Sequence, residues 1–172
     1  RVMAKGKKAI IIREGDRLIG VELTDGNSEI LMANRNGRAI RFHESKLRQM
    51  GRVSTGVRGM RLDDDGHDEV VGLVTMNENS GNNVMVISQE GFGKRSLLDD
   101  YRITNRGGKG VKTMNITDKT GELVAFKSVN DDNDLVIINK SGITLRIHVS
   151  DIRVMGRATQ GVRLINLDKR ND

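Results

Sequence analysis

The chain has 172 residues and a net charge of +6, and 36% of its residues are hydrophobic. This length favours a single domain, residues 1–172, with a sizeable core. No apolar run approaches the roughly 18 residues that a membrane helix needs, and no signal-peptide pattern opens the chain, so we expect no membrane partner. The lack of cysteine excludes disulfides and thiolate metal sites, and it favours a cytoplasmic location. Because Arg1 is not an initiator methionine, we expect a piece of a longer protein.

Short apolar runs separated by turn residues predict β-strands along the whole chain. Residues 1–27 are expected to be the tail of an earlier repeat, with strands at 9–12 and 18–21 joined by a turn at 14–16. Each later unit has an apolar strand, a glycine turn, a return strand, an irregular connection with one helical turn, a third strand, an acidic or asparagine-rich turn and a fourth strand. The predicted first strands are 30–32, 84–87 and 135–138, and the return strands are 39–42, 92–95 and 143–146. The helical turn is expected at 150–153, the third strand at 111–116, and fourth strands at 70–73 and 123–126.

The stretch at residues 91–116 occurs three times in the chain without a gap. Its turn glycines are Gly37, Gly91 and Gly142, which lie 54 and 51 residues apart. A period in this range is typical of propeller-like or solenoid arrays. Four strands per unit predict an all-β fold, a propeller-like array of four-stranded antiparallel blades. We place the repeats approximately at 1–27 (partial), 28–81, 82–133 and 134–172, and since propellers need roughly 4–8 blades, we expect an incomplete ring.

Basic residues recur at four places counted from the turn glycine, and we name the sets by that count. The position-4 arginines are Arg41, Arg95 and Arg146, and the position-11 arginines are Arg48, Arg102 and Arg153. The position-15 arginines are Arg52, Arg106 and Arg157, and the position-21 bases are Arg58, Lys112 and Arg163. The windows 37–62, 91–116 and 142–167 hold 17 Lys and Arg against 4 Asp and Glu, a balance of +13 that leaves −7 elsewhere. If the repeats stack, one rim becomes cationic and creates a strong local field.

These sets are the candidate contacts to a nucleic acid. The position-4 arginines either pair with an acidic turn of a neighbouring blade or point outward at phosphates; we favour phosphates, because nearby acids do not recur in register. Lys94, beside the second of these arginines, joins the set. In the middle copy Gly107, Gly108 and Lys109 extend it, because glycines allow close approach and can turn N–H groups toward an anion. The alternative for this loop is a flexible segment with solvated charges.

Other chemistry is not indicated. The three histidines occupy unrelated places in their repeats, and the acidic turns lack the spacing of a calcium loop, so we expect no metal site. An enzyme that uses paired acids such as Asp99 and Asp100 ranks behind a DNA-binding module and behind a protein-interaction scaffold of propeller type. Single-strand binders stack bases on aromatic side chains, and of the four aromatics Phe42 and Phe92 are expected to be buried. Duplex DNA is therefore the expected partner.

Several motifs occur in order along the chain. They are residues 15–21 (GDRLIGV), 50–52 (MGR), 56–62 (GVRGMRL), 91–95 (GFGKR) and 154–162 (VMGRATQGV). Together they resemble the C-terminal domain of the DNA gyrase A subunit, over essentially the whole length. The resemblance implies a β-pinwheel, a ring of blades that share strands between neighbours, with duplex DNA wrapped around its basic perimeter.

The resemblance also carries expectations about the parent enzyme. It implies a wrap of positive handedness that supports ATP-driven negative supercoiling, carried out in the bacterial cytoplasm with the gyrase B subunit, together with the rest of the gyrase A subunit. It assigns ATP, Mg²⁺ and the cleavage tyrosine to other parts of that enzyme, so no cofactor and no catalytic residue are expected in this fragment.

One departure from the family limits what is carried over. The family's signature box, a Gln and a base before Arg-Gly-Gly-x-Gly, belongs to the first blade. Residues 106–110 reproduce its core, but Thr104 and Asn105 stand where the Gln and the base would be. We therefore carry over DNA contact to this loop, and not the role of the box in completing the wrap. The related C-terminal domain of topoisomerase IV is the alternative, and three well-matched copies favour gyrase.

Overall fold

The computed structural model describes residues 5–167, and their regular structure consists of short strands and three single-turn 3₁₀-helices. The elements of the first blade are β1 (Glu29–Asn34), β2 (Arg38–His43), η1 (Glu44–Lys46) and β3 (Val70–Met76). Those of the second repeat are β4 (Asn83–Ser88), β5 (Phe92–Leu97), η2 (Leu98–Asp100), β6 (Val111–Lys112) and β7 (Leu123–Val129). The third has β8 (Asp134–Ile138), β9 (Thr144–His148), η3 (Val149–Asp151) and β10 (Val162–Arg163). The predicted all-β class is confirmed.

Neighbouring sheets share strands. The first sheet has the order β3-β1-β2-β6, the second has the order β10-β5-β4-β7, and β8 and β9 form a hairpin. Although β6 belongs to the second repeat in sequence, it pairs with β2 of the first sheet, with Val111 opposite Ala39. In the same way β10 crosses back to β5, with Val162 opposite Gly93. The second and third repeats thus each give one short strand to the preceding sheet, which confirms the pinwheel arrangement.

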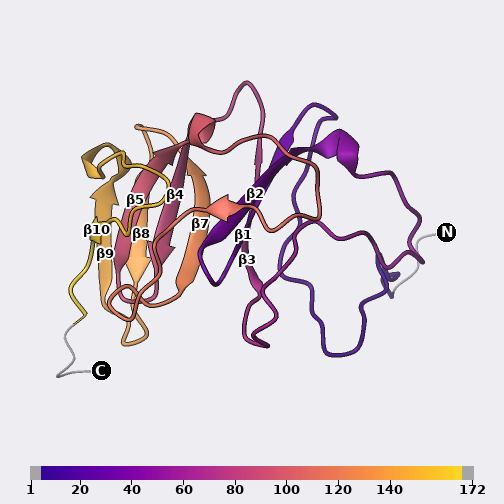
Figure 1. Ribbon diagram of the computed structural model, residues 1–172, viewed down its shortest axis with the longest axis horizontal. Coiled ribbons are helices and arrows are strands. Elements are labelled where there is room, and N and C mark those ends of the chain that lie inside the picture. The colour runs from indigo at the N-terminus through magenta and orange to yellow at the C-terminus, as the bar shows by residue number, and fades with distance from the viewer. Residues whose placement is uncertain (1–4, 168–172) are drawn as a thin grey trace.

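A mostly aliphatic core joins the sheets, and Figure 1 shows β1, β2 and β3 beside the strands of the second sheet along the long axis of the molecule. The largest cluster lies between the first and second sheets and includes Tyr101 and Phe126, whose rings meet edge to face with centroids 6.5 Å apart. A second cluster, around Met85 and Val149, joins the second sheet to the β8–β9 blade. Phe42 and Phe92 are buried, as predicted from the sequence.

The turn glycines fix the hairpins. Gly37, Gly91 and Gly142 have φ values of 89°, 83° and 85°, a region that disfavours residues with a side chain. The return strands that follow these turns are β2, β5 and β9, close to their predicted positions. Since the side chains on a strand alternate between faces, these registers decide which basic residues point inward and which point outward.

Two predictions about strands are wrong. Residues 9–12 and 18–21 form no strands, because the segment at 18–21 corresponds to a fourth strand, and no first strand is present beside it within residues 5–167. Its apolar side chains are consequently exposed, Val21 by 76%. The expected third strand at 111–116 ends at Lys112, because Thr113 and Met114 both donate to the carbonyl oxygen of Gly37 and bend the chain over the hairpin turn. The outer limits of the first and last predicted repeats lie outside the described residues.

Candidate nucleic-acid interface

The crossing loops, residues 47–56, 101–110 and 152–161, carry most of the candidate residues. The second and third loops run from their own 3₁₀-helix to the sheet of the preceding blade. Along this path the backbone N–H of Thr104 donates to the carbonyl oxygen of Arg41 at 2.8 Å. At the next junction Met155 donates to Arg95 at the same distance. Because the backbone follows one path at both junctions, basic residues at equivalent positions are presented in the same way.

The position-11 arginines are not engaged by other groups of the described chain. Arg48, Arg102 and Arg153 are all exposed. Within residues 5–167 their side chains have no hydrogen-bond or ion-pair partner. Arg52 and Arg58 are likewise exposed on the N-terminal part of the row. That these arginines contact DNA stays a prediction, and their exposure makes them available for it.

The position-15 arginines connect consecutive blades. Arg106 donates from Nε to the carbonyl oxygen of the last residue of η1 at 3.1 Å, and from Nη1 to that of Arg58 at 3.2 Å. Arg157 repeats both contacts one blade further, to the last residue of η2 at 3.1 Å and to Lys112 at 2.6 Å. Each guanidinium group therefore lies beside the position-21 base of the preceding blade. The fold thus brings position 15 of one repeat next to position 21 of the preceding repeat, although the two are 45–48 residues apart in the sequence.

Two position-4 arginines point inward, contrary to our favoured interpretation. Arg41 binds Glu29 at 2.6 Å and two carbonyl oxygens of the following blade at 3.1 and 3.0 Å, and its side chain is 11% exposed. Arg95 binds the carbonyl oxygen of Ile152 at 2.7 Å and the carboxylate of Asp131 at 2.5 Å. Both arginines fasten one blade to the next, because the hairpin register turns their side chains toward the junction. The other interpretation, pairing with an acidic turn of a neighbouring blade, fits Arg95, whose partner Asp131 lies in the turn before β8. It does not fit Arg41, whose partner Glu29 lies on the adjacent strand of the same hairpin.

Arg146 is the exposed member of the position-4 set. Its side chain is 72% exposed and binds Asp134, which also accepts from His148 at 2.6 Å. These contacts, with Arg146 the larger cause, lower the pKa of Asp134. The difference from the first two arginines is that, within the described chain, no further blade packs over Arg146.

Lys94 also points inward and cannot contact DNA directly in this conformation. Lys94 is fully buried, and its Nζ donates to the carbonyl oxygens of Gly156, Arg157 and Thr159 at 2.8, 2.5 and 2.8 Å. The corresponding residue of the first blade is the buried Ile40, so the position faces the interior. Burial, and next the charge of Arg157, lower the pKa of Lys94 to about 8. The sequence contained a signal for this burial, namely the apolar residues at the equivalent positions.

The glycine loop of the middle copy packs against the first blade. The N–H of Gly107 donates to the carbonyl oxygen of Gly59 at 2.7 Å, and Gly108 accepts from the N–H of Arg61 at 2.9 Å. The N–H of Gly107 therefore already has a protein partner. Lys109 is exposed, with Nζ 3.8 Å from a carboxylate oxygen of Asp63. The loop thus presents the basic side chains of Arg106 and Lys109 from a fixed backbone.

The position-21 bases of the crossing strands are also exposed. Lys112 lies on β6 and Arg163 on β10, each at the outer edge of the sheet that it joins. The guanidinium group of Arg163 lies 4.9 Å from the centre of the Phe92 ring, an arrangement that holds the side chain in place and leaves its charge exposed. These bases extend the row of cations beyond the loops.

The acidic turn at residues 63–69 is held against the β1–β2 turn. Asp65 accepts from Asn36 at 2.8 Å, and Asp68 accepts from Asn34 at 2.8 Å. The Asn36 contact, together with backbone N–H groups, lowers the pKa of Asp65 to about 2.

In the described part of the chain no group of three or more His, Cys, Asp or Glu side chains could hold a metal ion. No helix there is long and apolar enough to cross a bilayer.

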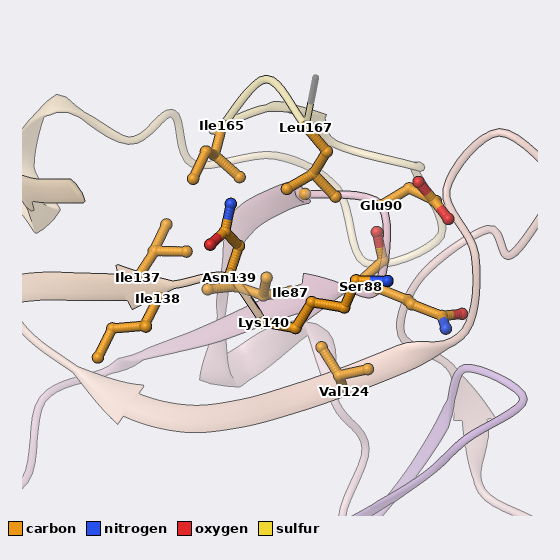
Figure 2. Close-up of a pocket in the computed structure, with 12 residues that line it drawn as sticks. Ile87, Ser88, Glu90, Val124, Ile137, Ile138, Asn139, Lys140, Ile165 and Leu167 are labelled. Atoms are coloured by element: carbon orange, nitrogen blue, oxygen red, sulfur yellow. The ribbon is translucent and has the colours of Figure 1, made fainter. Parts of the chain in front are cut away.

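A hollow of about 600 Å³ opens between the end of β4 and the β8–β9 turn. Figure 2 shows aliphatic side chains around it, among them Val124, Ile165 and Leu167. Glu90 and Lys140 are the charged residues of its lining. The lining offers no paired carboxylates and no nucleophile beside a base, so this hollow has no features of a catalytic pocket.

The fold and the row of exposed cations define the class: a strand-sharing, propeller-like domain with a basic surface on its crossing loops. A family model described as "DNA gyrase C-terminal domain, beta-propeller" matches residues 3–25, 28–75, 82–130 and 133–172. The chain is 47% identical over 167 residues to the DNA gyrase A subunit of Staphylococcus aureus (strain MRSA252), and it spans 19% of that protein's length. The chain therefore belongs to the DNA gyrase C-terminal domain family, which confirms the resemblance seen in its motifs.

Two solved structures share the fold. A DNA gyrase A C-terminal domain superposes with a TM-score of 0.85 at 22% identity, over 94% of this chain and 54% of the other. The C-terminal domain of a DNA topoisomerase IV superposes with a TM-score of 0.81 at 24% identity, over 90% of this chain and 48% of the other. Both likenesses concern architecture, and the membership of the gyrase family rests on the sequence matches.

Proposed function

We propose that this chain binds and bends duplex DNA as the wrapping domain of a gyrase A subunit. The observation that carries the proposal is the row of exposed cations on successive crossing loops, in which equivalent arginines follow one another from blade to blade. In the parent enzyme the wrap would support negative supercoiling, in a bacterial cytoplasm. ATP, Mg²⁺ and strand cleavage would belong to the gyrase B subunit or to the rest of the gyrase A subunit.

Duplex DNA fits this surface better than other polyanions do. A duplex carries regularly spaced phosphates, and smooth bending of a 20–30 bp site costs on the order of 1–6 kcal/mol, so a bending surface must offer charge continuously along its path. The loops and crossing strands do so with bases at three equivalent places per repeat. The aromatic residues of the crossing loops and cores support no base-stacking platform, since Tyr101, Phe42 and Phe92 are buried.

The salt dependence of binding tests the proposal. Titrations of a duplex of about 30 bp should give a log–log slope close to −0.9 for each phosphate contacted. Replacing Arg48, Arg102 and Arg153 by Ala should make the slope shallower by about 2.7, because three contacts are lost. These arginines are chosen because, within residues 5–167, their side chains bind nothing in the protein.

A matched control removes the same charge from outside the loops. Lys119, Lys127 and Lys140 are exposed and belong to turns and a strand outside the three crossing loops, so their replacement by Ala should leave the slope nearly unchanged. Equal effects of the two triple variants would contradict the proposal, since binding would then follow net charge. If neither variant changes DNA binding while a protein partner is lost, the interaction-scaffold alternative gains the support instead.

Wrapping is tested separately from binding. Ligation of a nicked circle in the presence of the chain should shift the linking number if the DNA follows a chiral path around the protein. Tight binding with no shift would limit the function to binding without wrapping.

A further inference from the structure

The Lys94 ammonium group holds a loop of the neighbouring blade. Nζ lies within hydrogen-bond distance of four acceptors, all of them in residues 156–159: three carbonyl oxygens at 2.5–2.8 Å and the hydroxyl oxygen of Thr159 at 3.2 Å. The loop also closes on itself, because the Thr159 hydroxyl donates to the carbonyl oxygen of Gly156 at 2.8 Å. An ammonium group has three donors, so this set of acceptors replaces its hydration completely.

The equivalent loop of the first junction is held differently. There the N–H of Gly107 donates to the carbonyl oxygen of Gly59 at 2.7 Å, and Gly107 has a φ of 86°. Ala158 stands at the place of Gly107, and no residue other than glycine has a positive φ in residues 5–167. The matching backbone bond, from Ala158 to Thr113, does not form within those residues. The next bond along the loop is kept, because the N–H of Asn115 donates to the carbonyl oxygen of Thr159 at 3.1 Å as that of Arg61 does to Gly108. The third loop therefore follows the same path but lacks the bond at Ala158, and the carbonyl oxygens beside Ala158 are bound by Lys94 instead.

This conformation determines where Arg157 lies. Its carbonyl oxygen is bound by Lys94, while its guanidinium group reaches two carbonyl oxygens of the second blade. Lys94 thus fixes the backbone of Arg157, and the second repeat fixes its side chain. Loss of the ammonium contact would release the backbone and leave three partly buried carbonyl oxygens without their charged donor, which is costly.

We propose that Lys94 is a positioning residue of the third crossing loop: its buried ammonium group fixes residues 156–159 and thereby presents Arg157 to DNA. The inference rests on the proposed function for its last step, since it takes DNA as the partner of Arg157. The ordering of the loop does not depend on DNA. Lys94 does in this loop what a glycine-dependent backbone bond does in the second one.

The charges around Lys94 add a pH dependence. The charged groups that face it are Arg157, on the loop, and Asp100, at the end of η2; burial and the arginine lower the pKa of Lys94 to about 8, and the aspartate opposes them. As the pH rises through this value the amine loses one of its three donors. The loop should loosen, and duplex affinity should fall, between about pH 7 and 9, above which little further change is expected.

The test compares Lys94→Met with Ile40→Met, the change at the equivalent buried position of the first blade. Hydrogen exchange of the free protein should show lower protection factors at residues 156–161 in Lys94→Met only, with the β4 amides unchanged. The slope of DNA affinity against salt should become shallower by about 0.9, which is about eightfold in affinity at 0.1 M salt relative to 1 M. The step in affinity near pH 8 should disappear from Lys94→Met and remain in Ile40→Met.

A rescue variant separates positioning from general stability. In Lys94→Met/Ala158→Gly the loop regains the residue that allows the backbone bond of the first junction, so protection at residues 156–161 should return without the ammonium group. Unchanged protection and slope in Lys94→Met would overturn the inference, and so would a double variant that fails to fold. If the wild-type chain binds no duplex, the proposed function fails, while the exchange results still decide whether Lys94 orders the loop.

Discussion

Replacing Arg41 with Met removes a contact between blades that the same substitution at Arg146 leaves almost untouched. The side chains of Arg41 and Glu29 are 11% and 20% exposed, whereas that of Arg146 is 72% exposed. Breaking a buried ion pair by removing one partner costs about 3–5 kcal/mol, because the other charge stays buried and unpaired. Since the Arg41 pair keeps some solvent contact, we expect about 3 kcal/mol of lost stability, and only a small change for Arg146→Met.

Urea unfolding followed by circular dichroism measures both variants. With a slope of about 2 kcal/mol per molar, a loss of about 3 kcal/mol moves the midpoint by about 1.5 M. A third variant, Glu29→Met/Arg41→Met, removes both charges and should recover much of the loss, because well-packed apolar residues replace a buried pair at little cost. Equal shifts for Arg41→Met and Arg146→Met would refute the reasoning, since burial would then not decide the contribution of this arginine.

Three further predictions follow from local geometry. Gly110→Ala should destabilise the chain by about 2 kcal/mol or more, because φ is 77° and a Cβ would overlap the carbonyl oxygen of Ala39. Gly56→Ala, at φ 83° with open space around it, should cost about 1 kcal/mol. Equal melting temperatures of the two variants would contradict the role of the overlap at Gly110. Tyr101→Phe should cost about 1–2 kcal/mol in urea unfolding, because its buried threonine partner loses a hydrogen bond; an unchanged midpoint would argue against that bond. Asp65 has a folded-state pKa of about 2 against an ordinary 3.8, so its stabilising effect is present above about pH 4 and is lost as the pH falls toward 2; acid unfolding of Asp65→Asn should lack this part of the transition.

The hairpins could be predicted from the sequence because strands and turns are local. Turn glycines need a positive φ, and short apolar runs beside them need a partner strand, so the hairpins β1–β2, β4–β5 and β8–β9 could be placed within a few residues. The crossing of β6 and β10 into the preceding sheet is a long-range pairing of only two residues each, and periodicity carries no information about it. The family resemblance supplied that feature.

The candidate site was predicted less well than the fold, because repetition shows that a residue matters without showing which way it points. The position-4 arginines recur since they join blades, a structural reason that produces the same pattern as a row of phosphate contacts. A signal was present: Glu29 and Asp134 each precede their arginine by twelve residues, which places acid and base on one face of the hairpin. In the middle copy Asn83 takes that place, and the carboxylate that binds Arg95 comes from Asp131 instead. The twelve-residue spacing of acid and arginine therefore does not recur in all three copies.

Strand sharing has a mechanical consequence for the row of blades. A blade in an ordinary propeller can tilt by itself, but here each sheet holds the last strand of the next repeat, at Ala39–Val111 and again at Gly93–Val162. A small rotation at one junction is therefore transmitted to all the blades that follow it in the row. Substitutions at the first junction should displace the far end of the molecule more than identical substitutions at the second, even where both cost the same free energy.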